Sequence, residues 1–330
     1  MARALALYSG GLDSALAILV MLRLGIQVTA VTFQTGFGCN QADSFRRAAR
    51  ATADRFGFDL IVSDITPQFL DIVKRPHFGY GKNMNPCLDC KILMLREAKK
   101  LMAETGADFL VTGEVPGQRP MSQRKHMLPV IDREAGLTGM IVRPLSARLM
   151  SPTIPEQNGL LEREMLFRIH GRSRKPQVAL AAELGLDDYQ QPAGGCLLTD
   201  SAYAERLRRL LQENPSATVR DILLLRVGRH FRLSDDAKAI IGRDERDNAA
   251  LGELLSSSDY RLFMKDCGSP LTTIVGDPSA AALRTAAALT ARYSAARMLP
   301  TVSVTVEKDG MQNTLDVTPA ADDQVDRLRD

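Results

Sequence analysis

The stretch SGGLDS at residues 9–14 constrains the fold most, because it separates a short apolar run from a helical pattern. Residues 4–8 (ALALY) predict a buried strand, and from Ser14 to about Gly25 apolar residues recur with helical spacing. Glycines between a strand and a helix let the backbone turn tightly and approach a ligand. The unpaired amides at the start of the helix attract phosphate. The segment therefore predicts a strand–loop–helix unit that binds a phosphate-bearing ligand, and an ordinary glycine turn with an N-cap is the alternative.

Strand and helix patterns go on alternating over the first two hundred residues. Further strands are predicted at 26–33, 59–65, 108–113 and 139–145, and helices at about 41–57 and 90–106. Strands that alternate with helices predict an α/β fold with a doubly wound parallel sheet.

The pattern changes near residue 200, where a smaller α+β domain is expected to follow. A helix is predicted at 200–214, an alanine-rich helix at about 278–297, and a hairpin over 301–317 that turns at Asp309-Gly310. We expect the two domains to cover residues 1–198 and 199–330. The polar residues 320–330 are expected to be disordered.

Composition excludes several classes of protein. The chain has 330 residues, of which 45% are hydrophobic and 25% charged, as in a packed globular protein. No apolar run approaches the length of a transmembrane helix, and ALALY is too short for a signal peptide, so we expect a cytoplasmic protein with no membrane partner. In a reducing compartment the five cysteines are expected to be thiols, metal ligands or catalysts.

Residues 9–14 lack the Gly-Lys-Ser/Thr ending of a Walker A loop. They resemble the PP-loop, Ser-Gly-Gly-x-Asp-Ser, of the N-type ATP pyrophosphatases. Those enzymes cleave ATP between its α and β phosphates and adenylate a substrate. The resemblance implies a HUP-type fold (adenine nucleotide alpha hydrolase-like) with ATP and Mg²⁺ as cofactors. Nucleotide binding is then expected of Ser9, Gly10, Gly11, Asp13 and Ser14, and Asp13 would also serve catalysis by holding the magnesium ion.

Three cysteines lie in two short motifs. NPCLDCK supplies Cys87 and Cys90 at the start of a predicted helix, and PAGGCLLTD supplies Cys196. A thiol at a helix N-terminus has a lowered pKa, and a CxxC pair can chelate a metal or form a redox couple. A [4Fe–4S] cluster normally takes four cysteines, so three would leave one iron open. Cys39 and Cys267 show no partner pattern and are expected to be core or adventitious thiols.

Both cysteine motifs look like the matching segments of the tRNA thiouridine synthases, which include the 4-thiouridine synthase and the 2-thiouridylases. This resemblance implies that Cys87, Cys90 and Cys196 ligate a [4Fe–4S] cluster whose free iron carries sulfur. The alternative that it leaves open is a persulfide and disulfide pair formed by Cys87 and Cys196. In either case Asp13, Cys87 and Cys196 would be the catalytic residues.

Other candidates follow from where ligands bind in open α/β sheets, which is at the carboxyl ends of the strands. At such positions we expect contact with the nucleotide or substrate from Phe33, Gly113, Glu114, Gln118 and Arg143. An ordinary loop role is the alternative for each of them.

Basic residues gather in GRSRKPQ (171–177) and between residues 201 and 232, a segment that contains seven arginines and only three acidic residues. Phosphate-backbone binding and a solvated surface are the two interpretations. Residues 227–248 look like the NFACT-R type of RNA-binding domain, and this implies RNA contacts. The candidates are Arg172, Arg174, Lys175, Arg208, Arg209, Arg229 and Arg232.

The resemblances together imply an ATP-dependent sulfurtransferase that adenylates a base carbonyl of RNA, taken here as tRNA, and replaces the oxygen with sulfur. Its sulfur donor would be sulfide or a cysteine desulfurase. Two alternatives stay open. One is a PP-loop enzyme that adenylates a small molecule and forms an amide or nitrile, and the other is a non-catalytic RNA-binding iron–sulfur protein.

Overall fold

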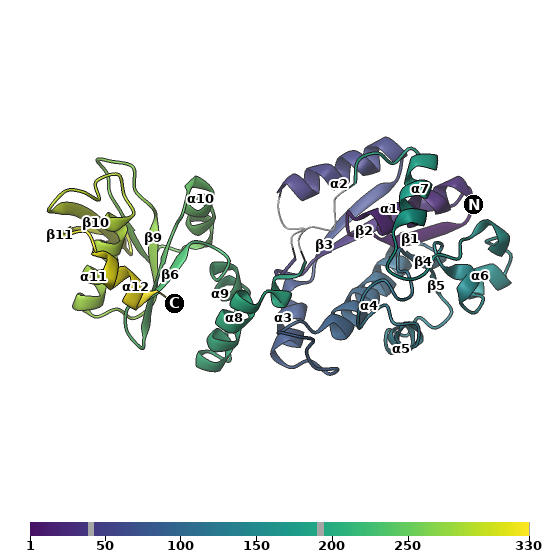
Figure 1. Ribbon diagram of the computed structural model, residues 1–330, viewed down its shortest axis with the longest axis horizontal. Helices are drawn as coiled ribbons and strands as arrows, with labels where there is room; N and C mark the ends of the chain where they lie inside the picture. The colour runs from purple at the N-terminus through teal and green to yellow at the C-terminus, as the bar shows by residue number, and fades with distance from the viewer. Residues whose placement is uncertain (39–42, 190–194, 330) are drawn as a thin grey trace. The chain divides into compact units, whose positions relative to one another are not determined.

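The computed structural model describes residues 1–38, 43–189 and 195–329. The chain forms two compact units, Met1–Arg208 and Arg209–Asp330 (Figure 1). The division lies inside one helix, α8 (Ser201–Glu213), further along the chain than the expected boundary at residues 198 and 199. Within the described ranges no helix is both long and apolar enough to cross a lipid bilayer.

The first unit is built on a parallel five-stranded sheet in the order β3-β2-β1-β4-β5. β1 lies at its centre, because Leu5 is in register with Thr29 on one side and with Leu110 on the other. The chain changes sides of β1 between β3 and β4, which creates a topological switch point at the carboxyl ends of β1 and β4. The strands are β1 (Arg3–Leu7), β2 (Gln27–Gln34), β3 (Asp59–Asp64), β4 (Phe109–Thr112) and β5 (Ile141–Val142).

Helices connect these strands, and the expected doubly wound parallel sheet is confirmed. The α-helices are α1 (Leu12–Arg23), α2 (Asp43–Phe56), α3 (Thr66–Lys74), α4 (Cys87–Thr105), α5 (Met127–Glu134), α6 (Ile154–Gln157) and α7 (Lys175–Glu183). Three short 3₁₀ turns are η2 (Ala147–Leu149), η3 (Arg163–Met165) and η4 (Leu197–Thr199).

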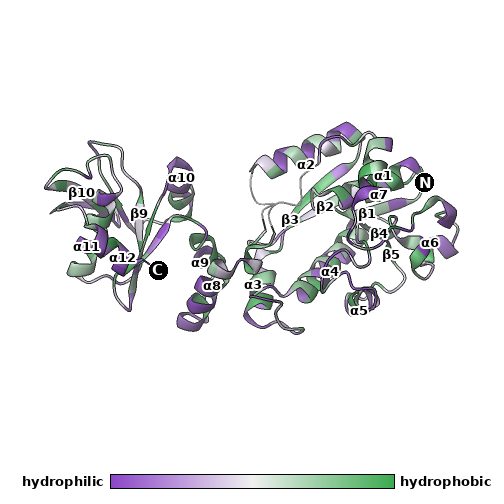
Figure 2. Cartoon of the chain, in the orientation of Figure 1, coloured by the Kyte–Doolittle hydropathy of each residue, from purple (hydrophilic) through white to green (hydrophobic). Residues whose placement is uncertain are grey.

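Successive residues of β1 pack into two different apolar cores, as the alternation of side chains along a strand requires. Ala4 and Ala6 join a core with α1, α2 and α7, whereas Leu5 joins a core with α4 and α5. α1 is buried over most of its length and largely green in Figure 2, while the outer helix α2 mixes purple and green. Both faces of the sheet are therefore covered, which leaves the strand ends as the place for a ligand.

The second unit is an antiparallel six-stranded sheet in the order β11-β10-β8-β9-β7-β6. Its strands are β6 (Arg229–Arg232), β7 (Ala237–Ile241), β8 (Tyr260–Phe263), β9 (Thr272–Gly276), β10 (Val302–Lys308) and β11 (Met311–Val317). Its other helices are α9 (Val219–Leu224), α10 (Glu245–Leu254), α11 (Ala280–Arg292) and α12 (Asp322–Leu328). Small residues of α11, such as Ala286 and Ala287, pack on the sheet in one core with Phe231 and Leu262.

The end of the chain confirms one expectation and corrects another. The hairpin of β10 and β11 turns at Asp309 and Gly310, whose φ angles of +51° and +75° suit a type I′ turn. The expectation of disorder over 320–330 is wrong for the described part, because Asp322–Leu328 forms α12. Val325 anchors this polar helix by packing into the core of the second unit.

Candidate active site

The loop at residues 9–14 connects β1 to α1 as the sequence predicts. Gly10 has a φ of +74°, a conformation that favours glycine, and Gly11 precedes the first residue of α1. The Ser14 hydroxyl donates to the Gly11 carbonyl oxygen at 2.8 Å and accepts from the Ser9 backbone amide at 3.2 Å. The N-cap residue, Gly11, makes no side-chain hydrogen bond to the first amides of α1. The loop is thus held by its own hydrogen bonds and leads into a helix N-terminus that its N-cap residue does not cap.

Gly113, which directly follows β4, lies against the backbone of this loop. A β-carbon at position 113 would stand 2.6 Å from the Ser14 nitrogen and closer still to the Asp13 carbonyl. Only glycine allows the two segments to approach this closely. The predicted candidates Gly113 and Asp13 therefore lie side by side, at the switch point of the sheet.

The Asp13 carboxylate is surrounded by polar side chains from two other segments. Gln118 donates from Nε2 to Asp13 Oδ2 at 2.5 Å, and Gln177 donates from Nε2 to Asp13 Oδ1 at 3.3 Å. The Arg174 Nη2 atom lies 4.0 Å from Asp13 Oδ2. Gln118 was a candidate from sequence, whereas Gln177 was not. Arg174 is expected from sequence to contact RNA, and its guanidinium group lies beside the loop.

Glu114 and Arg143 form a buried ion pair. Arg143 donates from Nε to Glu114 Oε2 at 3.0 Å and makes two further bonds to Asp132, at 2.6 and 2.9 Å. Lys91 Nζ lies 3.3 Å from Glu114 Oε1, and the Thr112 hydroxyl donates to Oε2 at 2.9 Å. The guanidinium group is 3% exposed, so we interpret Arg143 as a structural ion-pair partner and not as a phosphate ligand.

The charges around Glu114 decide its protonation state. Burial would raise the pKa of this carboxyl group, but the nearby Lys91 and Arg143 cations and the hydrogen bonds from Thr112 and Arg143 outweigh burial and lower it. Burial would likewise lower the pKa of Arg143, and the two carboxylates raise it instead. Both groups are therefore charged, and each neutralises the charge of the other inside the protein.

Phe33, which was expected to contact the nucleotide or substrate, is buried. Its side chain is 5% exposed and packs in the apolar core that contains Leu5, Ile65 and Leu95. We therefore interpret Phe33 as a core residue at the end of β2.

The structure brings the segment of Cys196 against the start of α4. The Met84 amide donates to the Leu198 carbonyl oxygen at 3.2 Å, and Asn83 Nδ2 donates to the Thr199 carbonyl oxygen at 2.7 Å. Cys87 is the first residue of α4, and its Sγ accepts from Asn85 Nδ2 at 3.2 Å. Two cysteine motifs that lie far apart in the sequence are thus held together by backbone and asparagine contacts.

Cys90 departs from the expectation of a lowered thiol pKa at a helix N-terminus. Burial raises its pKa, and the neighbouring Cys196 and Cys87 thiols raise it further, outweighing the favourable charge of Lys91. Among the described residues, no group of three or more His, Cys, Asp or Glu side chains is arranged to hold a metal ion as it stands.

Cys39 lies outside the described residues, and the Cys267 thiol of the second unit contacts Met264 Sδ at 3.9 Å.

Comparison with known proteins assigns each unit. Residues 1–148 match the family described as thiamine biosynthesis protein (ThiI), and residues 228–329 match the NFACT protein RNA binding domain. The first unit therefore resembles ThiI proteins over residues 1–148, and we call it the PP-loop domain. The second unit resembles the NFACT RNA-binding domain over residues 228–329, and we call it the NFACT-type domain. The PP-loop domain holds the loop at residues 9–14 and the three thiols, and the NFACT-type domain holds the six-stranded sheet.

Individual relatives cover parts of the chain. A tRNA-specific 2-thiouridylase MnmA of Azorhizobium caulinodans is 27% identical over 222 residues, which are 62% of this chain and 53% of that protein. A probable tRNA sulfurtransferase of Methanosarcina acetivorans is 35% identical over 122 residues, 34% of this chain and 27% of that protein. The chain therefore spans about half of the first relative and about a quarter of the second. A solved 4-thiouridine synthetase–RNA complex with bound ATP is 22% identical, with a TM-score of 0.37 over 65% of this chain and 51% of that one.

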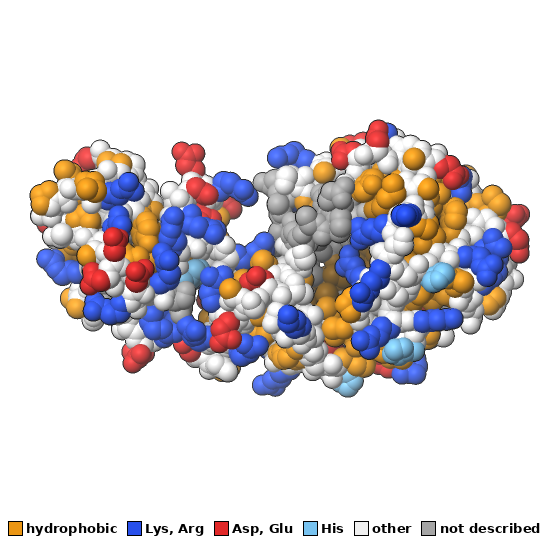
Figure 3. All heavy atoms as spheres, viewed as in Figure 1, with side chains coloured by type: hydrophobic (Ala, Val, Ile, Leu, Met, Phe, Trp, Pro, Cys, Tyr) orange, Lys and Arg blue, Asp and Glu red, His pale blue; other side chains and the backbone are white. Residues whose placement is uncertain are grey.

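Some of the predicted RNA-contacting residues are exposed, and others form ion pairs with glutamate side chains. In the PP-loop domain Arg172 and Lys175 are exposed, while Arg208 pairs with Glu205 at 2.6 Å. In the NFACT-type domain Arg232 pairs with Glu213 at 2.8 Å. On the face of this domain drawn in Figure 3, basic side chains form a band with a few acidic ones beside it. Arg209 lies at the start of the second unit.

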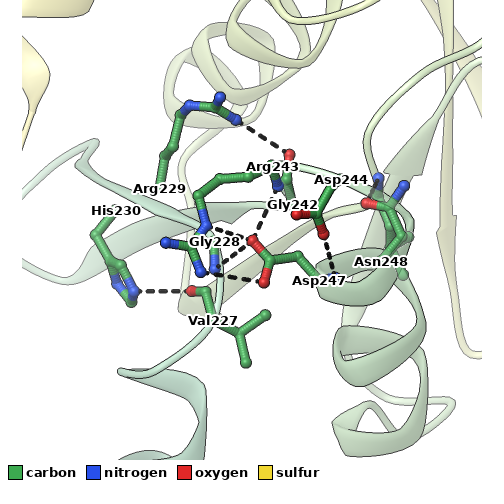
Figure 4. A network of polar contacts seen from close by, with 10 residues as sticks. Val227, Gly228, Arg229, His230, Gly242, Arg243, Asp244, Asp247 and Asn248 are labelled. Carbon is green, nitrogen blue, oxygen red and sulfur yellow. Dashed lines mark hydrogen bonds and ion pairs between the residues drawn. The ribbon is translucent and has the colours of Figure 1, made fainter. Parts of the chain in front are cut away.

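A polar network fixes the segment that carries Arg229 in the NFACT-type domain (Figure 4). Asp247 accepts from the Gly228 amide at 3.2 Å, the Arg243 amide at 3.1 Å and the Arg243 Nε atom at 2.5 Å. Arg229 donates to the Gly242 carbonyl oxygen at 3.3 Å, and its guanidinium carbon lies 4.6 Å from the centre of the Tyr293 ring. The network rigidifies the turn into β6, and with it the position of that arginine.

Proposed function

We propose that the chain is an ATP-dependent sulfurtransferase that adenylates a base carbonyl of tRNA and replaces its oxygen with sulfur in the cytoplasm. The observation that carries the proposal is a short series of contacts from the ATP loop to the thiols. Gly113 presses on Asp13, its neighbour Glu114 pairs with Lys91, and Lys91 follows Cys90 on α4. An adenylating loop and a thiol set at the edge of one sheet suit a reaction that activates an oxygen and then replaces it.

The loop would supply the first half of the reaction. The amides at the start of α1 and the hydroxyl groups of Ser9 and Ser14 would bind the phosphates, and the helix N-terminus would stabilise the charge that develops there. Asp13 would hold a magnesium ion, which neutralises phosphate charge when bound. Its carboxylate fits this role because two amide donors leave further lone pairs for the metal. The base oxygen attacks the α-phosphorus, and pyrophosphate leaves.

The thiols would supply the second half. Cys87, Cys90 and Cys196 fit a [4Fe–4S] cluster in ligand type, although among the described residues their side chains are not arranged to hold a metal as they stand. Such a cluster would offer one open iron to sulfide. The persulfide route needs only Cys87 and Cys196. In the cluster route the donor would be sulfide. In the persulfide route a cysteine desulfurase would transfer sulfane sulfur to Cys196, the outer sulfur would attack the activated carbon, and the Cys87 thiol would break the S–S bond by forming a disulfide with Cys196 that an external thiol reduces. In either route AMP leaves.

RNA would be held by the NFACT-type domain together with exposed basic residues of the PP-loop domain. The match of residues 228–329 to an RNA-binding family supports this, as does the basic band in Figure 3. Phosphate contacts position a nucleic acid without reading its sequence. The base to be thiolated would then be chosen at the PP-loop domain.

The experiment measures pyrophosphate release and thionucleosides after the protein is incubated with tRNA, ATP, Mg²⁺ and sulfide under anaerobic conditions. We expect both products with wild type and neither with Asp13→Asn. Pyrophosphate release that needs a small molecule and not RNA would favour the small-molecule alternative. RNA binding with no pyrophosphate at all would favour the non-catalytic one.

Iron and acid-labile sulfide assays with an EPR spectrum separate the two sulfur routes. About four irons per chain are expected for the anaerobically purified wild type. Cys196→Ala should lose them, whereas the matched control Cys267→Ala, in the other domain, should keep them. A folded wild type that contains no iron, and that thiolates RNA when a cysteine desulfurase and cysteine replace sulfide, would refute the cluster and leave the persulfide route.

A further inference from the structure

Two carboxamide side chains, from segments that lie far apart in the sequence, hold the Asp13 carboxylate. Gln118 lies in the loop after β4 and contacts Oδ2, while Gln177 lies in the first turn of α7 and contacts Oδ1. Gln177 Nε2 also donates to Gln118 Oε1 at 3.0 Å, which locks the two amides to each other. The orientation of the Asp13 carboxylate is therefore set by this pair.

Gln177 carries an unused acceptor at this site. The residue is completely buried, and its Oε1 atom has no hydrogen-bond partner among the residues that the structure describes. An unpaired buried acceptor costs free energy, so such atoms are uncommon in folded proteins and mark places where a ligand or water completes the bonding. An apolar residue of similar volume would fill this space without that cost. The neighbouring Arg174 guanidinium group adds positive charge on the Oδ2 side of Asp13.

We propose that Gln177 is a positioning residue for magnesium-bound ATP. Its amide nitrogen orients the Asp13 carboxylate toward the metal, and its free oxygen accepts a hydrogen bond from a water of the metal shell. Magnesium suits this arrangement because it loses its waters reluctantly and is usually held by only one or two carboxylates. The inference rests on the proposed function, since it assumes that the loop binds ATP.

Calorimetric titration with ATP, once with Mg²⁺ and once with EDTA, tests the assignment without measuring activity. Gln177→Met keeps length and volume but removes the amide. It should weaken binding of magnesium-bound ATP about tenfold and change binding of metal-free ATP less than twofold. Gln157→Leu, at an exposed glutamine of the same domain, should match wild type in both titrations.

A second variant keeps the test decisive if Gln177→Met does not fold. Gln177→Asn keeps an uncharged amide but is one methylene too short to reach Asp13, so it should also weaken binding of magnesium-bound ATP more than binding of metal-free ATP. Equal weakening with and without Mg²⁺, or no weakening in either variant, would overturn the assignment and leave Gln177 as a packing residue. A wild type that binds no ATP would overturn the proposed function itself, and this inference with it.

Discussion

Gly113→Ala tests most directly how the ATP loop is built. The new β-carbon would stand 2.6 Å from the Ser14 nitrogen, where ordinary contact begins at 3.4 Å. The atoms that it meets belong to the backbone, so no side chain can rotate away to make room. Either the end of β4 or the loop at residues 9–14 must move by roughly 1 Å, because packed interiors hold no spare volume.

The size of the effect follows from that displacement. Overpacking of this kind costs about 1–3 kcal/mol in the free energy of unfolding. A shift of about 1 Å in a catalytic group lowers the rate about 100-fold. We therefore expect Gly113→Ala to unfold at lower urea concentration and to release pyrophosphate about 100-fold more slowly at saturating ATP.

The matched control is Gly252→Ala in the interior of α10, where a β-carbon would meet nothing within 4 Å. There alanine should raise the free energy of unfolding by about 0.5–1 kcal/mol, since it is the better helix former. The same exchange should thus have opposite signs at the two positions. A Gly113→Ala protein with wild-type stability and wild-type pyrophosphate release would refute the close contact between β4 and the loop.

Two other sites give further predictions. Glu114→Ala should lower the free energy of unfolding at pH 7 by about 3 kcal/mol in urea titrations, because Lys91 and Arg143 lose a buried partner. The pKa of Glu114 is lower in the folded chain than its ordinary value of 4.5 in the unfolded chain. As the pH falls, the unfolded chain therefore binds the proton first. The free energy that the charged Glu114 contributes to folding is present above pH 4.5 and is lost as the pH falls further. Glu114→Gln should flatten that acid limb, and an unchanged limb would contradict the assignment. Asp247→Ala should lower the free energy of unfolding by about 2 kcal/mol and speed hydrogen exchange at the Gly228 and Arg243 amides. Unchanged exchange at these amides would contradict the hydrogen bonds to Asp247.

Local residue types were enough to predict the strand–loop–helix unit and the last hairpin. Gly10 and Gly310 lie where the backbone needs a positive φ, and a glycine at such a position can be recognised in the sequence. The spacing of apolar residues likewise located β1 and β10 to within one residue. Both features depend on neighbours along the chain, which is why they could be predicted.

Partners from distant segments could not be predicted. Arg143 ends a strand at the ligand edge and therefore suggested a phosphate contact, but Asp132 and Glu114 reach it from other segments. Gln177 belongs to no motif, and only the fold brings it to Asp13. The helix α12 escaped detection because its composition is polar and tertiary packing of Val325 stabilises it.

The contact of residues 196–199 with the segment before α4 sets the order in which parts of the first domain can form during synthesis. β1 gains its second neighbour only when Thr112 is available to pair with Leu7, and the Asn83 contact spans 116 residues of chain to Thr199. The thiol set is therefore the last part of the first domain to come together on the ribosome. At about 5–20 residues per second, translation of the second domain then lasts on the order of ten seconds. In that interval the segments that carry the three thiols are already in contact on a nascent chain that has yet to gain its second domain.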